Sequence, residues 1–258
     1  MTSEAFFRLT DDQKRAYIQE IAVKIAPKIR NFEYVHPTDI FYSMSDETTV
    51  DLALPSGTLW AKCNIGATTP YEAGKYFQWG DVNGYTGSQV GGSKIFNWAN
   101  YKYANGAADK LTKYCPSSKT DYWDGSGAPD NKLILDQEDD AAFFGLNSDW
   151  QMPTKEQFNE LINYTTHSWD ASRSGFTFTA NGEELFLFGA GYANNSSVNN
   201  YGSRGNYWSR SLNESNPNNA WRLNFNNDGT YNVNNNNRYN GFSVRPVRSQ
   251  HFYPVLLF

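Results

Sequence analysis

Eighteen of the 47 residues between Asn194 and Asn240 are asparagine, and this composition constrains the fold more than any other feature of the chain. Asn is a poor strand former, and Asn-rich tracts are often disordered. Residues 221–226 nevertheless alternate strictly between apolar and polar side chains, as does a strand with one buried face, and residues 231–234 follow the same pattern. A disordered tract does not bury side chains in a core, so it does not require an apolar face. We therefore predict a folded segment with an apolar scaffold and an outward face made mostly of Asn.

The charge of this region favours a role in binding. From Tyr192 to Arg248 there are six Arg, no Lys and two acidic residues, a net charge of +4 in a chain whose net charge is −5. A mixture of Asn, Ser, Tyr, Trp, Gly and Arg is typical of antibody binding loops, whereas solvated surfaces are mostly rich in Lys and Glu. We interpret residues 192–248 as a ligand-binding surface. Its predicted contact residues are Asn194, Asn195, Asn199, Asn200, Tyr201, Arg204, Asn206, Arg210, Asn213, Arg222, Asn224, Asn226, Tyr231, Asn232, Asn234, Asn236 and Arg238.

Upstream of this region the sequence predicts a first strand over residues 50–55. Residues 80–131 are mostly polar and rich in Gly, which is too much loop for an ordinary β-sandwich. A short helix is then expected from near Asp136 to near Gly145, with acidic residues at its start, where the helix dipole favours them.

A second short helix is expected after Pro153, because Thr154 and Gln157 have the spacing of a capping box. The Asn-Gly pair at 181–182 lies between two apolar runs and predicts a tight hairpin turn. The returning strand, residues 185–188, is apolar on both faces and should be central. Short strands, two short helices and long loops together predict an α+β fold.

Residues 1–48 have a different character. Thr10 and Gln13 form another capping-box pattern, and apolar residues recur at helical spacing as far as Ile25. We predict an N-terminal helical segment, which either packs on its own domain or docks onto a larger assembly, and one domain over residues 49–258. No stretch approaches the roughly 20 apolar residues of a membrane span. The N-terminus lacks the signal-peptide pattern, so we expect a location on a phage particle or in the cytoplasm.

Ordered sequence blocks between residues 50 and 248 resemble the Fibrobacter-type major paralogous domain. The blocks are VDLALPSGTLWA at 50–61, NIGA at 64–67, YFQWG at 76–80, EDDAA at 138–142, WQMPT at 150–154, YWS at 207–209 and SVRPVR at 243–248. One departure is Gln151, where the family usually has Arg; we expect it to remove a structural ion pair rather than a function. The resemblance implies a fold similar to that of the C-type lectins and the formylglycine-generating enzyme.

Some members of that family are variable proteins of diversity-generating retroelements, in which an error-prone reverse transcriptase scrambles the adenines of a copied repeat. Asn codons are AAT or AAC, so they are preferred targets. The resemblance therefore implies a ligand-binding protein with a sequence-diversified surface, such as a phage receptor-binding or adhesion protein, whose partner is a protein or glycan on a cell surface. The alternatives are an enzyme of the formylglycine-generating, sulfatase-modifying type and a non-variable, lectin-like structural protein.

The sequence offers little for catalysis, and we predict no catalytic residues and no enzyme. A formylglycine-type activity needs reactive cysteines in the C-terminal half, and Cys63 and Cys115 both precede it. The three His residues stand alone, without the spacing of a zinc site. The negative net charge does not favour nucleic acid as a partner.

No cofactor is predicted, although a structural calcium ion is left open. One Gly-rich loop supplies oxygen ligands from Asp121, Asp124, Ser126, Asp130 and Asn131, although not with the spacing of an EF-hand. Calcium-dependent sugar-binding lectins carry a Glu-Pro-Asn or Gln-Pro-Asp motif. Residues 216–218 read Asn-Pro-Asn, one carboxylate short, so calcium-mediated sugar binding is not expected.

Overall fold

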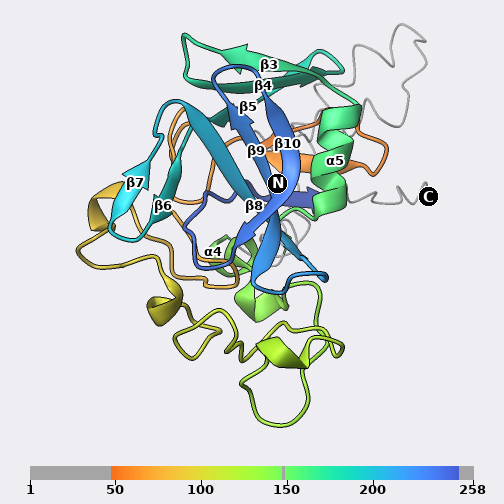
Figure 1. Cartoon of the computed structure of the whole chain (residues 1–258). Helices are drawn as coiled ribbons and strands as arrows, with labels where there is room; N and C mark the ends of the chain where they lie inside the picture. The colour runs from red at the N-terminus through yellow and green to blue at the C-terminus, as the bar shows by residue number, and fades with distance from the viewer. Residues whose placement is uncertain (1–47, 147–148, 250–258) are drawn as a thin grey trace, which may run out of the picture. The chain divides into compact units, whose positions relative to one another are not determined.

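The computed structural model describes residues 48–146 and 149–249 (Figure 1). The chain divides into two compact units, Met1–Thr49 and Val50–Phe258, and the described residues belong almost entirely to the second. The helix predicted within residues 1–48 lies outside the described residues.

The organising element is a three-stranded antiparallel sheet in the order β10-β9-β8 (Figure 1). Its strands are β8 (Arg204–Leu212), β9 (Asn219–Asn226) and β10 (Tyr231–Asn237). The Asn-rich segment is therefore folded, as predicted, even though Asn disfavours strands. Packing overrides the propensity here, because β9 is buried along most of its length.

A cluster of buried apolar residues lies on each side of this sheet. Tyr207, Leu223 and Phe225 join a cluster with Trp60, Phe158 and Phe176 on one side. On the other side, Trp208 and Ala220 join a second cluster that includes Trp79 and Phe242. Gly205 permits the first packing, since a Cβ there would lie 1.9 Å from Cζ of Phe225. The sheet thus has apolar partners on both faces, whereas the alternation in the sequence predicted only one.

A second sheet, in the order β3-β4-β5, packs against the first cluster. It consists of β3 (Thr166–Asp170), β4 (Gly175–Ala180) and β5 (Glu183–Phe188). The predicted hairpin is confirmed: Asn181 and Gly182 both have positive φ, the conformation that a tight I′ turn requires. The central position predicted for the return strand is wrong, because β5 is an edge of its sheet, although residues 185–188 are buried.

The helix predicted after Pro153 is also confirmed. It is α5 (Lys155–Asn163), capped by Thr154 and Gln157 in a capping box, with Phe158 and Leu161 buried. The helix predicted from near Asp136 is split into a 3-10 turn, Gln137–Asp139, and α4 (Ala141–Gly145). The split falls at Asp140, whose extended backbone and side-chain oxygen cap the start of α4.

The remaining strands close the fold. A third sheet has the order β1-β2-β11, with β1 (Thr49–Val50), β2 (Thr58–Ala61) and β11 (Val247–Ser249), and a hairpin pairs β6 (Tyr192–Asn194) with β7 (Ser197–Asn199). The first strand predicted over residues 50–55 is therefore wrong in extent: β1 ends at Val50, and a turn at Pro55 separates it from β2.

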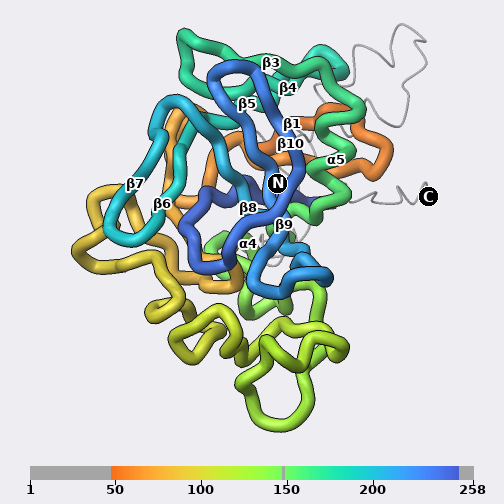
Figure 2. The backbone as a smooth tube through the Cα atoms, viewed as in Figure 1, coloured from red at the N-terminus to blue at the C-terminus, as the bar shows by residue number. Residues whose placement is uncertain are grey.

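Residues 80–131 form the predicted loops, with only three 3-10 turns, Gly87–Gln89, Trp98–Asn100 and Thr120–Tyr122. Figure 2 shows their yellow and light-green backbone as an irregular run at the lower end of the view. The described part of the chain is thus a β-rich α+β domain with long loops. None of its helices is long and apolar enough to cross a membrane.

The two aromatic residues on the apolar side of β9 should differ in their contribution to stability. Phe225 is fully buried, so Phe225→Ala should lower the free energy of unfolding by about 3–5 kcal/mol through the cavity it leaves. Trp221 is half-buried beneath the Lys155 ammonium, 4.8 Å from its ring, and Trp221→Ala should cost less than half as much. Urea denaturation of the two variants measures the difference. Equal losses would mean that Trp221 is a core residue after all.

Candidate functional site

The strand register places eight of the seventeen predicted contact residues on one face of the β8–β10 sheet. Residues directly opposite one another in an antiparallel pair point to the same side. The register pairs Asn206 with Asn224 and Asn224 with Asn232, and it pairs Arg222 with Asn234. We call this side the Asn face, and its members are Arg204, Asn206, Trp208, Ala220, Arg222, Asn224, Asn226, Asn232, Asn234 and Asn236.

The inner half of the Asn face is buried, which corrects the sequence prediction. Asn206, Arg222 and Asn224 were expected to point into solvent, but their relative exposures are 2%, 6% and 4%. The cause is Trp208, which lies on the same face and packs against Phe242 in a tilted arrangement with ring centroids 4.2 Å apart. The core cluster around these two rings covers this part of the sheet.

These buried polar groups form a hydrogen-bonded network. Asn224 Nδ2 donates to the carbonyl oxygen of Gly205 at 2.9 Å and to Asn206 Oδ1 at 3.3 Å. Asn206 Nδ2 donates to the Gly191 carbonyl at 2.9 Å, and its Oδ1 also accepts a hydrogen bond from Arg222 Nη1. The amides of Asn206 and Asn224 therefore hold the sheet together and are occupied within the protein.

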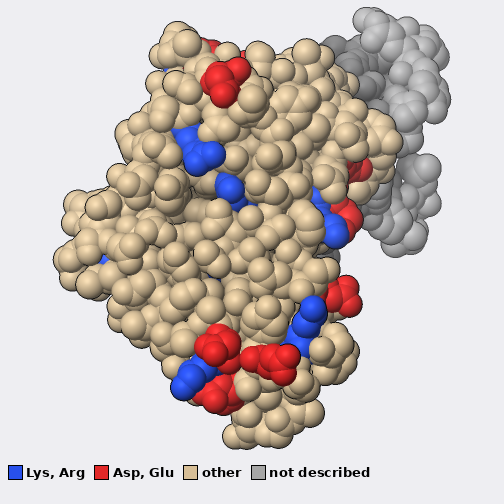
Figure 3. All heavy atoms as spheres, in the orientation of Figure 1, with Lys and Arg blue, Asp and Glu red and all other residues tan. Residues whose placement is uncertain are grey.

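The outer half of the Asn face is accessible. Asn232 is exposed, and Arg204, Asn226, Asn234 and Asn236 are half-buried. Arg204 Nε donates to Asn226 Oδ1 at 2.7 Å. In the orientation of Figure 1, few Lys, Arg, Asp or Glu side chains lie over β8, β9 and β10, whereas charged side chains gather at the loops at the bottom of the view (Figure 3).

The Asn face continues onto the β6–β7 hairpin through a chain of amides. Asn194 Nδ2 donates to Asn240 Oδ1 at 2.7 Å, and Asn240 Nδ2 donates to Asn236 Oδ1 at 2.7 Å. Tyr239 also contacts this chain, since its hydroxyl accepts a hydrogen bond from Asn194 at 3.4 Å. The sequence prediction did not include Tyr239 and Asn240, although both lie within the Asn-rich segment.

The structure places the other predicted contact residues elsewhere. Tyr231 lies on the opposite side of the sheet, with its ring 4.4 Å from that of His167. Asn213 is largely buried, and its side-chain oxygen accepts from the backbone N–H groups of Ser215 and Asn216 in a turn. Asn195 and Asn200 are exposed and Asn199 is half-buried, all three on or beside the β6–β7 hairpin.

Arg238 was predicted to point outward, and this prediction is wrong because its side chain is fully buried. Its guanidinium donates to the carbonyl oxygens of Tyr114 (2.8 Å), Pro217 (3.0 Å) and Lys113 (3.0 Å), and Nε donates to the Tyr101 hydroxyl (2.8 Å). It also lies 5.1 Å from the rings of Trp79 and Tyr101. Such contacts satisfy a guanidinium without a carboxylate, so Arg238 is part of the scaffold.

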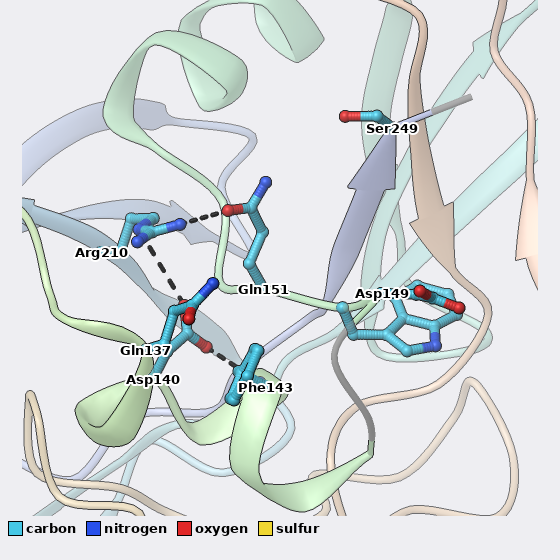
Figure 4. A pocket seen from close by; sticks show the side chains of 8 residues that line it. Gln137, Asp140, Phe143, Asp149, Gln151, Arg210 and Ser249 are labelled. Carbon is cyan, nitrogen blue, oxygen red and sulfur yellow. Dashed lines mark hydrogen bonds and ion pairs between the residues drawn. The ribbon is translucent and has the colours of Figure 1, made fainter. Parts of the chain in front are cut away.

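Arg210 lines a separate pocket of about 160 Å³ at the other end of β8 (Figure 4). Its Nη1 donates to Gln151 Oε1, its Nη2 donates to the Leu135 carbonyl at 2.8 Å, and its Nε lies 4.0 Å from Asp140 Oδ2. At position 151, where the family usually has Arg, the chain has Gln151, a neutral acceptor. The cation beside Asp140 is supplied by Arg210. Burial raises the pKa of Asp140 above its ordinary value. The hydrogen bonds from Met152 and the charge of Arg210 act in the opposite direction but do not outweigh burial.

Tyr201 borders a third feature, an open groove of about 440 Å³. The side chain of Tyr201 is 60% exposed, and its ring packs edge-on against Phe188 at 5.2 Å. Val198 lines the same groove from β7. Among the described residues that line the groove, Glu72 is the one acid, and its carboxylate accepts from the backbone N–H of Thr68. The predicted contact residues thus occupy several surfaces, of which the Asn face holds the largest number.

The proposed calcium loop does not assemble as a metal site among the described residues. The carboxylate of Asp130 accepts from the backbone N–H groups of Tyr114 and Cys115, and Asp124 accepts from the Asn105 amide. The one acidic group in the described residues with metal-like spacing is Asp136, Glu138 and Asp139.

Lysine ammonium groups neutralise that acidic group. Lys113 Nζ lies 2.5 Å from Asp139 and 2.8 Å from Asp136, and Lys102 Nζ lies 3.0 Å from Asp139. The hydroxyls of Tyr103 and Tyr114 also donate to Asp139. Burial alone would raise the pKa of Asp139, but these hydrogen bonds outweigh burial and lower the pKa to about 2. The donor set fits a structural ion-pair network better than a metal ion.

The described residues offer no arrangement for thiol chemistry. Cys63 and Cys115 are both free; Cys115 is buried and Cys63 is half-buried. Burial raises the pKa of both thiols, which disfavours the reactive thiolate.

Comparison with known proteins identifies the family. A family model described as the Lcl C-terminal domain matches residues 47–248, and the chain therefore belongs to that family. The match covers all of the sequence blocks noted above and confirms the family resemblance drawn from them. No curated protein and no solved structure matches the chain.

The two ends of one cross-strand pair should differ in their tolerance to mutation. Asn224→Ala removes the two donated hydrogen bonds and leaves a buried acceptor unsatisfied, so we expect a loss of about 1–3 kcal/mol in the free energy of unfolding. Asn232→Ala, at the exposed partner position, should change it by no more than about 0.5 kcal/mol. Chemical denaturation of both variants tests this. If Asn224→Ala leaves the free energy of unfolding unchanged, Asn224 can vary in sequence as freely as the exposed positions.

The Asp139 network should make stability depend on pH. The pKa of Asp139 in the folded state, about 2, is below its ordinary value of 3.8, so its contribution is complete above a pH of about 4 and is lost as the pH falls towards 2. Asp139→Asn should lower stability at neutral pH and flatten its pH dependence between about 4 and 2. The neighbouring, largely exposed Glu138 provides the control, since Glu138→Gln should leave both unchanged. Urea denaturation at several pH values measures the effect. If the free energy of unfolding of Asp139→Asn falls with decreasing pH as steeply as that of the native chain, the prediction is contradicted.

Proposed function

We propose that this chain is a ligand-binding protein with a C-type-lectin-like fold, whose Asn face is diversified in sequence by a retroelement. The observation that carries the proposal is the division of the β8–β10 sheet into a buried scaffold and an accessible, Asn-rich outer half. A surface of this kind can change its side chains while the packing beneath stays the same. Membership of the Lcl C-terminal domain family supports a binding role.

The burial pattern sharpens which positions can vary. Asn226, Asn232, Asn234 and Asn236 lie at the accessible edge, where substitutions of other polar residues meet solvent. Asn206 and Asn224 are occupied in the hydrogen-bonded network beneath them. We infer that adenine-directed diversity is productive at the first group and destructive at the second.

The proposed activity is binding without catalysis, and the ligand is a protein or glycan on a cell surface. The polar edge fits this role, since short amides adapt their hydrogen bonds to many partners, as they do in antibody loops. A phage receptor-binding or adhesion protein is the specific form of the proposal. The alternative, an enzyme of the sulfatase-modifying type, finds no support in the burial of Cys115 or in the raised pKa of Cys63.

The proposal predicts that binding depends on the accessible Asn residues. The native chain and a variant with scrambled residues at positions 226, 232, 234 and 236 would be applied to an array of cell-surface proteins and glycans. The control variant carries the same number of changes at exposed positions on β3, β4 and β5, namely Thr166, Ser168, Thr179 and Glu183.

We expect the first variant to lose or exchange its targets and the control to keep them, with both variants remaining folded. Targets that are the same for all three proteins would place the binding site elsewhere. The groove beside Tyr201 would then be the surface to examine.

A further inference from the structure

The groove beside Tyr201 lies between two segments that are far apart in the sequence. One wall comes from the loop that leads to Tyr76, and the other comes from β7 and the turn that follows it, which supply Val198 and Tyr201. The lining includes Gly at positions 66, 74 and 87, so part of the wall is bare backbone. The volume of about 440 Å³ lies within the range that is typical of small-molecule sites.

Hydrogen bonds within the protein hold the groove in place. Asn64 Nδ2 donates to the carbonyl oxygen of Glu72 at 3.0 Å, and Asn64 Oδ1 accepts from Arg245 Nε at 2.8 Å. The Tyr76 hydroxyl donates to the Ala190 carbonyl at 2.6 Å and so ties this wall to the segment before β6. A ligand would therefore meet a preformed groove, and this lowers the ordering cost of binding.

The charge of the groove comes from Glu72, the one charged side chain among the described residues that line it. The backbone N–H of Thr68 donates to Glu72 Oε2 at 2.8 Å and lowers the pKa of this carboxyl below its ordinary value, so Glu72 is ionised at neutral pH. Burial raises the pKa of Tyr76, and the nearby Tyr201 hydroxyl adds to the increase, so Tyr76 stays neutral. The groove therefore favours a cation over an anion.

The carboxylate of Glu72 has little capacity left to accept hydrogen bonds from a ligand. Thr68 supplies its N–H and its hydroxyl, and the backbone and side chain of Thr69 are also hydrogen-bonded to this carboxylate. These donors match the roughly four lone-pair sites of a carboxylate. A primary ammonium or a guanidinium would lose hydrogen bonds to water here without replacing them. A quaternary ammonium has no N–H group, so it keeps the electrostatic attraction without that cost.

Aromatic rings complete the site. Tyr201 is 60% exposed and Tyr76 is almost fully buried, and both line the groove. Phe188 packs edge-on against Tyr201 with ring centroids 5.2 Å apart and so supports that ring. The face of a tyrosine ring attracts a cation within about 6 Å of its centre, and quaternary ammonium groups are well suited to such contacts.

We propose that this groove binds a small organic cation with a quaternary ammonium group, for which choline is the test ligand. The trimethylammonium group lies against the Tyr201 ring, near the Glu72 carboxylate, and the Gly lining leaves room for its methyl groups. The inference concerns a surface other than the Asn face and does not depend on sequence diversification. A free cation fits better than a lipid head group, because the chain has a net charge of −5 and peripheral membrane binding draws on basic residues.

Three soluble probes test the ligand class. The full chain is titrated by NMR with choline, with ethanolamine and with the uncharged analogue of choline in which a tert-butyl group replaces the trimethylammonium group. We expect choline to bind about tenfold more tightly than either analogue, because ethanolamine must give up hydrogen bonds and the carbon analogue has no charge. Equal binding of all three probes, or no binding of choline, would overturn the proposal. Retention of the chain on phosphatidylcholine vesicles without binding of free choline would overturn it too.

A matched set of variants locates the aromatic contact. Tyr201→Phe keeps the ring and should keep the affinity for choline within about twofold, whereas Tyr201→Leu should weaken binding by about fivefold or more. Tyr164→Leu removes a tyrosine that is equally exposed, at 60%, at the end of α5, and it should leave choline binding unchanged. If Tyr201→Leu binds choline as tightly as Tyr201→Phe, the ring makes no cation contact and the assignment is wrong.

The charge contribution is tested at Glu72. Glu72→Gln should weaken choline binding about fivefold, whereas Glu138→Gln, which neutralises an exposed carboxylate elsewhere, should not. If Glu72→Gln fails to fold, the native chain provides the readout. Choline should shift the ring resonances of Tyr201 saturably, and the carbon analogue should not. Tyr201 resonances that stay unshifted while choline binds would place the cation elsewhere and overturn the assignment.

Discussion

The guanidinium of Arg238 holds together parts of the chain that no strand connects. It lies just after β10 and is hydrogen-bonded to carbonyl oxygens of residues 113, 114 and 217, while its flat face lies over Trp79. A buried cation of this kind is costly to desolvate, and its donors must all be occupied. The long loops of residues 80–131 supply two of those acceptors, so they are tied to the end of the sheet despite having little regular structure. Arg245 links segments at the start of the fold, where it donates to Asn64 and to the carbonyls of Ala61 and Lys62, although its Nη2 has no hydrogen-bond partner. Because the loops are anchored in this way, the turn that carries Tyr239 and Asn240, and with it one edge of the Asn face, has a fixed position.

Two buried arginines on or beside this sheet differ in the hydrogen-bond acceptors that surround them. Arg238 and Arg222 are both buried and both contact aromatic rings, and within residues 48–146 and 149–249 neither has a carboxylate as an ion-pair partner. Acceptors surround Arg238 at every nitrogen, whereas Arg222 has a single amide acceptor and an unsatisfied Nε. Unsatisfied buried donors cost about 1–3 kcal/mol and are rarely kept without a reason. The two arginines therefore differ in their hydrogen bonds and not in their burial class.

The sequence predicted those parts of the fold that depend on local signals. The capping box at Thr154 and the Asn-Gly turn at 181–182 are set by interactions within a few residues, and both are present in the structure. The alternation in residues 221–226 correctly predicted a strand, because the apolar side has a partner core. It failed for Arg222 and Asn224, because period-two alternation says nothing about what covers the polar side. The sequence does contain a sign that both faces are covered, namely the adjacent aromatic residues Tyr207 and Trp208. Neighbouring residues of a strand point to opposite faces, so each face carries one large ring and needs an apolar partner. Arg238 failed for a different reason, since the carbonyls that bury it come from loops more than 100 residues away.

The buried half of the Asn face limits how this surface can evolve. Adenine-directed mutagenesis would act on every Asn codon alike. It does not distinguish an Asn side chain that faces solvent from one that is hydrogen-bonded to the Gly205 or Gly191 carbonyl. A change at Asn206 or Asn224 leaves those groups unsatisfied beneath Trp208, in the middle of the sheet. A change at Asn232 touches neither the network nor the core. If Asn206 and Asn224 were copied from the mutable template, a large share of the variants would lose stability before they presented a new surface. Under the proposed function, structural selection retains Asn at these two positions, and diversification accounts for Asn at the accessible edge. The boundary between the two groups then lies between β9, where Asn224 is buried, and β10, where Asn232 is exposed.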